Sequence, residues 1–155
     1  MNDADRQILD HFRQIRERTL DLLERIPEEL LDQTAEGEER PLRILFLHIA
    51  RTVDSWMAGP LKDGLGQPVY GTDKGSLELA LRVSADRLTG FFEADPERMA
   101  REVPETLETT GQPVVWTGRD RVLYLAAHEI HHRGKMVLAL RQAGFADIPP
   151  MPLDW

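Results

Sequence analysis

The sequence contains no cysteine, no excess of basic residues and no long apolar run. Without cysteine there is no disulfide, no thiolate nucleophile and no cysteine-ligated metal site. The net charge of −8 repels phosphate backbones and anionic lipid surfaces, so neither nucleic-acid nor membrane partners are expected. No apolar segment approaches the roughly 20 residues of a membrane-spanning helix. If the protein binds a metal, its ligands must therefore be histidine, aspartate or glutamate.

The first residues, MNDADRQILDHF, are acidic and lack the basic and then apolar layout of a secretory signal, which predicts a cytoplasmic protein. The length of 155 residues suits one domain with a hydrophobic core, spanning residues 1–155. Hydrophobic residues make up 41% and charged residues 30% of the chain, so the composition indicates an ordinary globular protein.

Four segments carry the apolar periodicity of amphipathic helices. They span about residues 3–26, Pro41 to Gly59, Ser76 (as N-cap) to Asp95, and Thr117 to Gly144. Thr117 and Asp120 are spaced as a capping box, and Gly144 suits a left-handed cap at the end of a helix. Four helices of this length in one small chain predict an all-α fold, a four-helix bundle.

The connections between these helices are not all short. We expect the first and third connections to run along the length of the bundle, so the helices need not alternate strictly in direction. Residues 101–117 contain two short segments around TTGQP. They predict either a short β-hairpin or an ordered loop between the third and fourth helices.

Three of the five histidines lie within five positions of the fourth segment, in YLAAHEIHHRGKM. His128 and His132 are four residues apart, so their imidazoles lie one helical turn apart and can converge on one metal ion. A third ligand must come from elsewhere, and His48, in the apolar middle of the second segment, is the candidate. A histidine buried there needs partners for its ring nitrogens, and a shared metal would satisfy one of them.

Each part of this pattern also has a simpler explanation. A single buried histidine is commonly a hydrogen-bonded core residue, and a histidine pair at i and i+4 arises by chance. The combination in a chain without cysteine favours a metal site. His131 is open to three interpretations, as a hydrogen-bond donor to the site, a pocket residue or a surface residue. His11, at the edge of the first apolar stripe, is interpreted as a boundary residue.

The string from His128 to His132 also matches HExxH, the signature of zinc peptidases. The third zinc ligand of those enzymes lies downstream as a glutamate or histidine. After His132 this chain has neither, so we reject the peptidase interpretation. Glu129 is then expected to take part in an ion pair or to support the site, with Arg133 one turn later as its candidate partner.

In the strings LFLHIARTVDSWMAG and LAAHEIHHRGKM, the chain resembles the DinB/YfiT-like superfamily of metal-dependent proteins. The second string is close to the family pattern HxxHHRGQ, with Lys135 where glutamine often stands. The resemblance implies an up-down-down-up bundle that binds one divalent metal through His48, His128 and His132. Zinc or nickel is the expected ion, with iron or manganese as alternatives.

The same resemblance implies a homodimer, and some relatives transfer low-molecular-weight thiols. The predicted function is therefore a metal-dependent enzyme acting on a small molecule, of the thiol transferase or hydrolase type. Three neutral imidazoles would leave the ion an open coordination position, where a bound water or thiol becomes more acidic. The alternatives are a non-catalytic metal-binding or stress-related bundle and a metal-free helical interaction module.

Helical geometry also names neighbours of the three histidines, although none is assigned a catalytic role. The residues placed near the site in this way are Arg51, Thr52, Ser55, Tyr124 and Lys135. Each is suited to bind a substrate carboxylate or an oxyanion, but residues of these types are more often ordinary surface or packing residues. Trp56 and Trp116 are expected to pack in the core rather than line a pocket.

Overall fold

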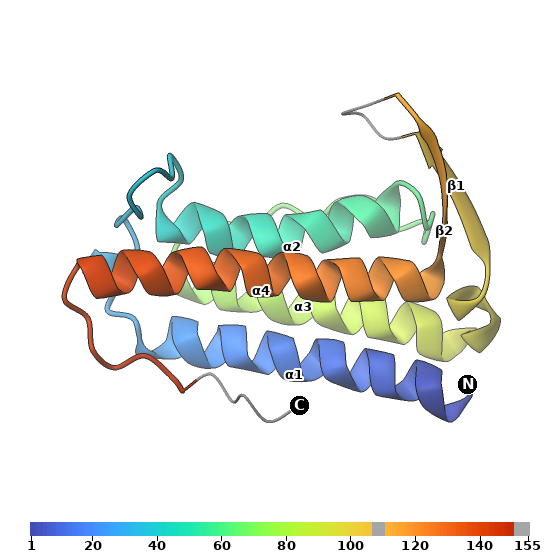
Figure 1. Cartoon of the computed structure of the whole chain (residues 1–155), viewed down its shortest axis with the longest axis horizontal. Helices are drawn as coiled ribbons and strands as arrows, with labels where there is room; N and C mark the ends of the chain where they lie inside the picture. The colour runs from blue at the N-terminus through green and yellow to red at the C-terminus, as the bar shows by residue number, and fades with distance from the viewer. Residues whose placement is uncertain (107–110, 151–155) are drawn as a thin grey trace.

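The computed structural model describes residues 1–106 and 111–150. Its elements are α1 (Asp3–Arg25), η1 (Glu28–Leu30), α2 (Leu42–Ala58), α3 (Lys74–Ala94), η2 (Pro96–Met99), β1 (Glu102–Thr106), β2 (Pro113–Thr117) and α4 (Gly118–Gln142). The four long helices pack side by side as a bundle, and the two strands stand at one end of it (Figure 1). The predicted all-α four-helix bundle is therefore confirmed.

The helices follow an up-down-down-up order. Arg43, at the start of α2, donates to the carbonyl of Thr72, just before α3, at 2.8 Å. Lys74, the first residue of α3, donates to the carbonyls of Glu24 and Ile26 at the end of α1, at 2.8 and 2.7 Å. Helices α2 and α3 therefore both begin at the end of the bundle where α1 stops, and α4 returns antiparallel to them (Figure 1).

The connection that runs along the bundle is consequently the second, residues 59–73, and the expectation of long first and third crossovers was wrong. The first connection forms η1 and the turns around it, and the third forms η2 and the hairpin, so neither runs along the bundle. The second connection is held by Arg87 of α3, which donates to Asp63 in the connection and to Asp54 of α2. The hydroxyl of Tyr70 also donates to Asp54, at 3.1 Å.

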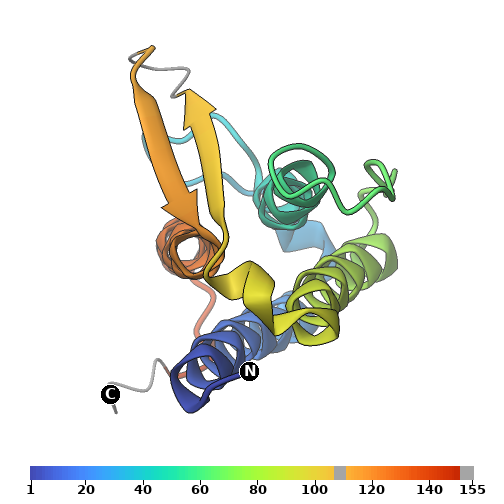
Figure 2. The same cartoon turned by 90° about the vertical axis from the view of Figure 1, so that its right-hand side faces the viewer.

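The strands confirm the hairpin that the sequence left open. They pair antiparallel, with Glu102 opposite Thr117 and Thr106 opposite Pro113. Figure 2 shows the hairpin rising from the end of the bundle where α4 begins. Gly118 is needed at this junction, because a Cβ there would lie 2.3 Å from the carbonyl oxygen of Arg98. Residues 107–110 and 151–155 lie outside the described part of the chain.

The ends of the helices follow the predicted capping chemistry with one correction. The capping box of Thr117 and Asp120 is present, and Gly144 adopts a left-handed φ of +78°. The N-cap of α3 is Asp73 rather than Ser76. Its carboxylate accepts from the backbone N–H of Ser76 at 2.9 Å and from the Ser76 hydroxyl at 2.6 Å. The sequence prediction therefore took Ser76, which is the third residue of α3, for the residue that caps the helix.

Apolar side chains fill the interior in two clusters. One contains Phe46, Leu81 and Met136, and the other contains Phe12 and Phe92. Each cluster joins residues of different helices, which fixes the helices against one another through apolar burial. Within the described part of the chain, no helix is both long and apolar enough to cross a membrane.

Candidate metal centre

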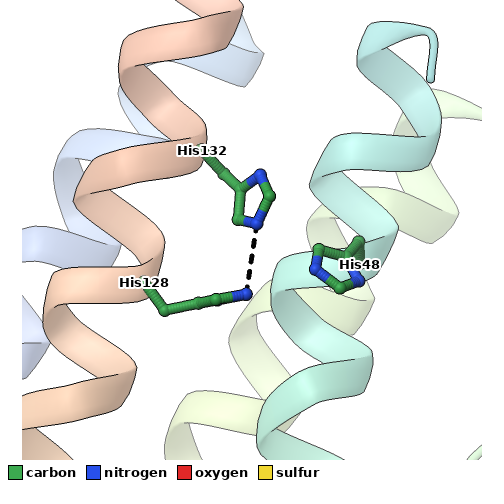
Figure 3. A group of neighbouring side chains, drawn as sticks. All are labelled: His48, His128 and His132. Atoms are coloured by element: carbon green, nitrogen blue, oxygen red, sulfur yellow. Dashed lines mark hydrogen bonds between the residues drawn. The ribbon is translucent and has the colours of Figure 1, made fainter. Parts of the chain in front are cut away.

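The three histidines singled out in the sequence meet between α2 and α4. His48 points from α2 toward His128 and His132 on α4 (Figure 3). One ring nitrogen of each residue lies within 4.8 Å of the corresponding nitrogens of the other two. Nε2 of His128 and Nε2 of His132 are 3.1 Å apart. The i, i+4 spacing on α4 and the apolar packing of α2 therefore bring three imidazoles to one point.

This geometry fits a divalent ion. A tetrahedral ion about 2.1 Å from each nitrogen separates two ligand nitrogens by about 3.4 Å. The observed separations, 3.1 Å for one pair and at most 4.8 Å for the others, need only small ring rotations to reach that value. Three imidazoles without a carboxylate suit zinc, nickel or another late transition metal better than magnesium or calcium.

The surroundings keep all three imidazoles neutral, which is the form that binds metal. Burial, and then the charges of the neighbouring histidines, lower the pKa of His132 to about 3 and that of His128 to about 4. Burial, and then the positive charge of Arg40, lower the pKa of His48. Protons therefore leave His128 and His132 well below neutral pH, and the lowered pKa of His48 favours its neutral form as well. The nitrogen lone pairs are then available to a cation.

The outer nitrogens of the two α4 ligands are held by packing alone. Nδ1 of His128 and Nδ1 of His132 are buried, and neither has a hydrogen-bond partner among the described residues. Metal-bound histidines commonly donate this N–H to a carboxylate or carbonyl. Here the neighbours are aromatic rings instead. The ring centroid of Tyr124 lies 6.0 Å from that of His128, and the ring centroid of His131 lies 5.1 Å from that of His132. His131 itself is exposed.

Aromatic residues border the site on the hairpin side. Tyr124, one turn before His128, stacks on Trp56 with ring centroids 4.8 Å apart and planes 9° from parallel. The guanidinium of the buried Arg121 lies over the Trp56 ring at 4.0 Å and over the Trp116 ring at 5.0 Å. Both tryptophans are half-buried, so the expectation that they belong to the core holds only in part.

A charged group borders the opposite side. The carboxylate of Glu38, in the connection before α2, accepts from Nζ of Lys135 at 2.6 Å. It also accepts from the backbone N–H groups of Glu39 at 3.2 Å and Arg40 at 3.4 Å. Lys135 was named from the sequence, but Glu38 and Arg40 were missed. The one available signal was that Arg40 directly precedes Pro41, where the helix of His48 begins.

Within the described residues, none of the other expected neighbours forms a hydrogen bond with an imidazole of the cluster. The hydroxyl of Thr52 donates to the backbone carbonyl of His48 at 2.8 Å, and Arg51 and Ser55 are exposed. His11 is half-exposed, in agreement with a boundary position.

The predicted pairing of Glu129 with Arg133 was wrong. Glu129 is buried and pairs with Arg16 of α1 at 2.9 Å, whereas Arg133 donates to the carbonyl of Ile15 at 3.1 Å. Both side chains leave α4 toward α1, because residues 129 and 133 lie about 100° around the helix from residues 128 and 132. A carboxylate held there cannot act as the base of a peptidase at the histidine cluster.

Comparison with known proteins identifies the family. The model of the DinB family matches residues 1–151. The chain belongs to the DinB family. A DinB-like protein from Bacillus cereus ATCC 10987 is 19% identical, with a TM-score of 0.71 over 94% of this chain and 95% of that one.

A second DinB-like protein, from Bacillus subtilis, is 22% identical, with a TM-score of 0.68 over 93% of this chain and 96% of that one. At such identities the likeness establishes the shared DinB bundle fold alone. The search of curated proteins found no match.

Proposed function

We propose that this DinB-family protein is a divalent-metal-dependent enzyme whose ion, zinc or nickel, is bound by His48, His128 and His132. The observation that carries the proposal is the convergence of three neutral imidazoles from two helices, with ligand nitrogens within 4.8 Å of one another. Because the ligands come from α2 and α4, the site exists only in the folded bundle. The ligand set is uncharged, so a bound ion keeps its full positive charge.

Such an ion supplies Lewis-acid chemistry at a vacant coordination position, where water or a thiol is deprotonated near neutral pH. The side chains of this protein favour a thiol over water as the reacting group. Hydrolysis also calls for a group that delivers a proton to the leaving group, but Glu129 is held by Arg16 and Glu38 by Lys135. Transfer of a small thiol made more acidic by the ion would need no such group, and the chain has no cysteine of its own to supply the sulfur. We therefore propose transfer of a small thiol, with hydrolysis as the second candidate.

Metal analysis tests the site itself. Protein purified without a histidine tag should contain about one ion per chain, in the three-histidine coordination described above. The variant His48→Ala should lose the ion, whereas His131→Ala, which removes an exposed histidine beside the cluster, should keep it. If neither variant changes the metal content, or if no metal binds, the metal-free interaction module replaces this proposal.

Cobalt substitution tests whether the site is open. The visible bands of the cobalt protein should shift when azide or a small thiol is added, because these ligands enter the vacant position. Bands that respond to no added ligand would indicate a closed structural site. The protein would then be the non-catalytic metal-binding bundle.

We further propose that the protein acts in the cytoplasm as a homodimer. The homodimer is supported by an exposed stripe on α4. It is formed by Leu123, Ala127, Gly134 and Leu138, which recur at helical spacing. The two leucines are 46% and 47% exposed. A Cβ added at Gly134 would have no neighbour within 4 Å, so the surface between the leucines is open. Small residues between two apolar ones allow two copies of a helix to approach closely.

A further inference from the structure

Arg40 lies beside the histidine cluster although it precedes His48 by eight residues. The carboxylate of Glu38 links the two regions, because Oε1 accepts from the N–H of Arg40 at 3.4 Å and Oε2 accepts from Nζ of Lys135 at 2.6 Å. Lys135 follows His132 by three residues on α4. The connection before α2 therefore carries Arg40 to the face of the bundle on which the histidines meet.

The two cations at this place differ in their partners. Lys135 is neutralised by Glu38. Arg40 is exposed, and in the parts of the chain that the structure describes its guanidinium forms no ion pair. Arg43, three residues later, contacts Asp32 at 2.5 Å and Glu28 at 3.6 Å. Glu28, Asp32 and Glu38 are thus paired with other cations, while Glu36 and Glu39 lie close to Arg40 in the sequence and form no ion pair within the described residues. Arg40 is left exposed and available to a ligand.

The charge of Arg40 reaches the ligands. Among the charged groups around His48, Arg40 has the largest effect on its pKa and lowers it, and Arg40 also lowers the pKa of His128. On the other side of the cluster stand Trp56 and Tyr124, which offer stacked rings and no positive charge. A ligand at the ion therefore meets an unpaired cation at one side and aromatic surface at the other.

We propose that Arg40 binds a carboxylate of the small thiol on which the metal centre acts, so that the preferred substrates are thiols carrying a negative charge. The guanidinium suits this role, because its planar donors match a carboxylate in a two-point contact. The inference rests on the proposed function, since the thiol must occupy the open position of the ion. To the proposed function it adds the negative charge of the preferred thiol and names Arg40 as the residue that recognises this charge.

The test compares two thiols of the same chain length, one with a free carboxylate and one in which a methyl ester removes its charge. Cobalt-loaded protein is titrated with 3-mercaptopropionate and with its uncharged methyl ester, and binding is followed by the visible bands. The wild-type protein should bind the acid about tenfold more tightly than the ester, as expected for one charge-assisted contact. In Arg40→Gln the two affinities should become similar, and Arg40→Lys should restore part of the preference.

A matched control removes a different charge. Arg51 is exposed on α2 and is not among the charges that act on the three histidines. The variant Arg51→Gln should therefore keep the preference for the acid, although its net charge equals that of Arg40→Gln. The preference in the wild-type protein should also weaken in high salt, because the Arg40 contact is exposed.

The outcomes separate the two proposals. If cobalt binds and both thiols shift its bands, but Arg40→Gln keeps the wild-type ratio of affinities, the role of Arg40 is overturned and the open metal site stands. A wild-type ratio that does not change with salt also overturns it. If no cobalt bands form, or neither thiol shifts them, the proposed function fails and the inference fails with it.

Discussion

Arg16 of α1 and Glu129 of α4 form an ion pair in the interior of the bundle, each only 1% exposed. Nε of Arg16 donates to both carboxylate oxygens, at 3.1 and 3.0 Å. The guanidinium also donates to the carbonyl of Leu81 at 2.5 Å and to the hydroxyl of Ser84 at 2.8 Å. The pair therefore ties α1, α3 and α4 together, and it holds Glu129, the neighbour of His128 in the sequence, away from the histidine cluster.

Removing one partner of this pair should be costly. We expect Glu129→Ala to lower the free energy of unfolding by about 3–5 kcal/mol, because it leaves the charge of Arg16 buried without a partner. Urea denaturation measures the change. The control Glu78→Ala removes an exposed partner of Arg82 and should cost less than about 1 kcal/mol.

The metal content of Glu129→Gln distinguishes structure from catalysis. Because the carboxylate faces α1, this variant should bind as much metal as the wild-type protein. Loss of the ion without a comparable loss of stability would contradict the structural role given to Glu129.

The sequence predicted the parts of the site that depend on local spacing. His128 and His132 share a face of one helix whatever surrounds it, and the absence of cysteine limited the choice of ligands. Contacts between segments that are far apart in the sequence could not be predicted from local spacing. Glu129 had Arg133 one turn away, yet it pairs with a residue 113 positions earlier, because the packing of α1 on α4 decides what faces it. Arg40 was missed for the same reason, since Glu38 brings its loop to α4.

In the fold, too, local features were predictable from the sequence and long-range features were not. Helical periodicity and capping residues predicted the four helices closely, but the connection that runs along the bundle was misassigned. Connection length alone does not reveal whether residues form a local hairpin or cross the molecule. The ion pair of Arg87 with Asp63 holds the second connection along the bundle, and it joins residues whose proximity follows only from the helix order.

The N-cap of α3 can be tested by two substitutions. Asp73→Ala should destabilise the protein by about 1 kcal/mol, because the backbone N–H of Ser76 loses its acceptor. Ser76→Ala should cost less, since its hydroxyl only donates to the cap. Thermal unfolding of the two variants measures both effects. An equal or larger loss in Ser76→Ala would show that Ser76 is the more important capping residue.

The metal-free protein should lose stability as the pH falls from about 6.5 toward 4. The pKa values of His128 and His132 are lowered to about 4 and about 3, whereas in the unfolded chain they lie near 6.5. Between these limits the unfolded state binds more protons, so the contribution to stability is complete above about pH 6.5 and is lost as the pH falls through the folded values.

Urea unfolding in the presence of a chelator, at several pH values between 5 and 8, measures this dependence. The double variant His128→Gln/His132→Gln should unfold with a shallower pH dependence, by up to about two protons. If the variant and the wild-type protein have the same slope, the two imidazoles are not kept neutral by the fold.

The exposed stripe on α4 makes the homodimer testable. Leu138→Glu should give a monomer in light scattering, because two copies packed through this stripe would bury an unpaired carboxylate from each subunit. The control Leu79→Glu alters a leucine of α3 that is 57% exposed, and it should leave the dimer intact. All three proposed metal ligands belong to one chain, so the monomeric variant should bind as much metal as the wild-type protein. A wild-type protein that is itself a monomer would remove the homodimer and leave the metal centre unaffected.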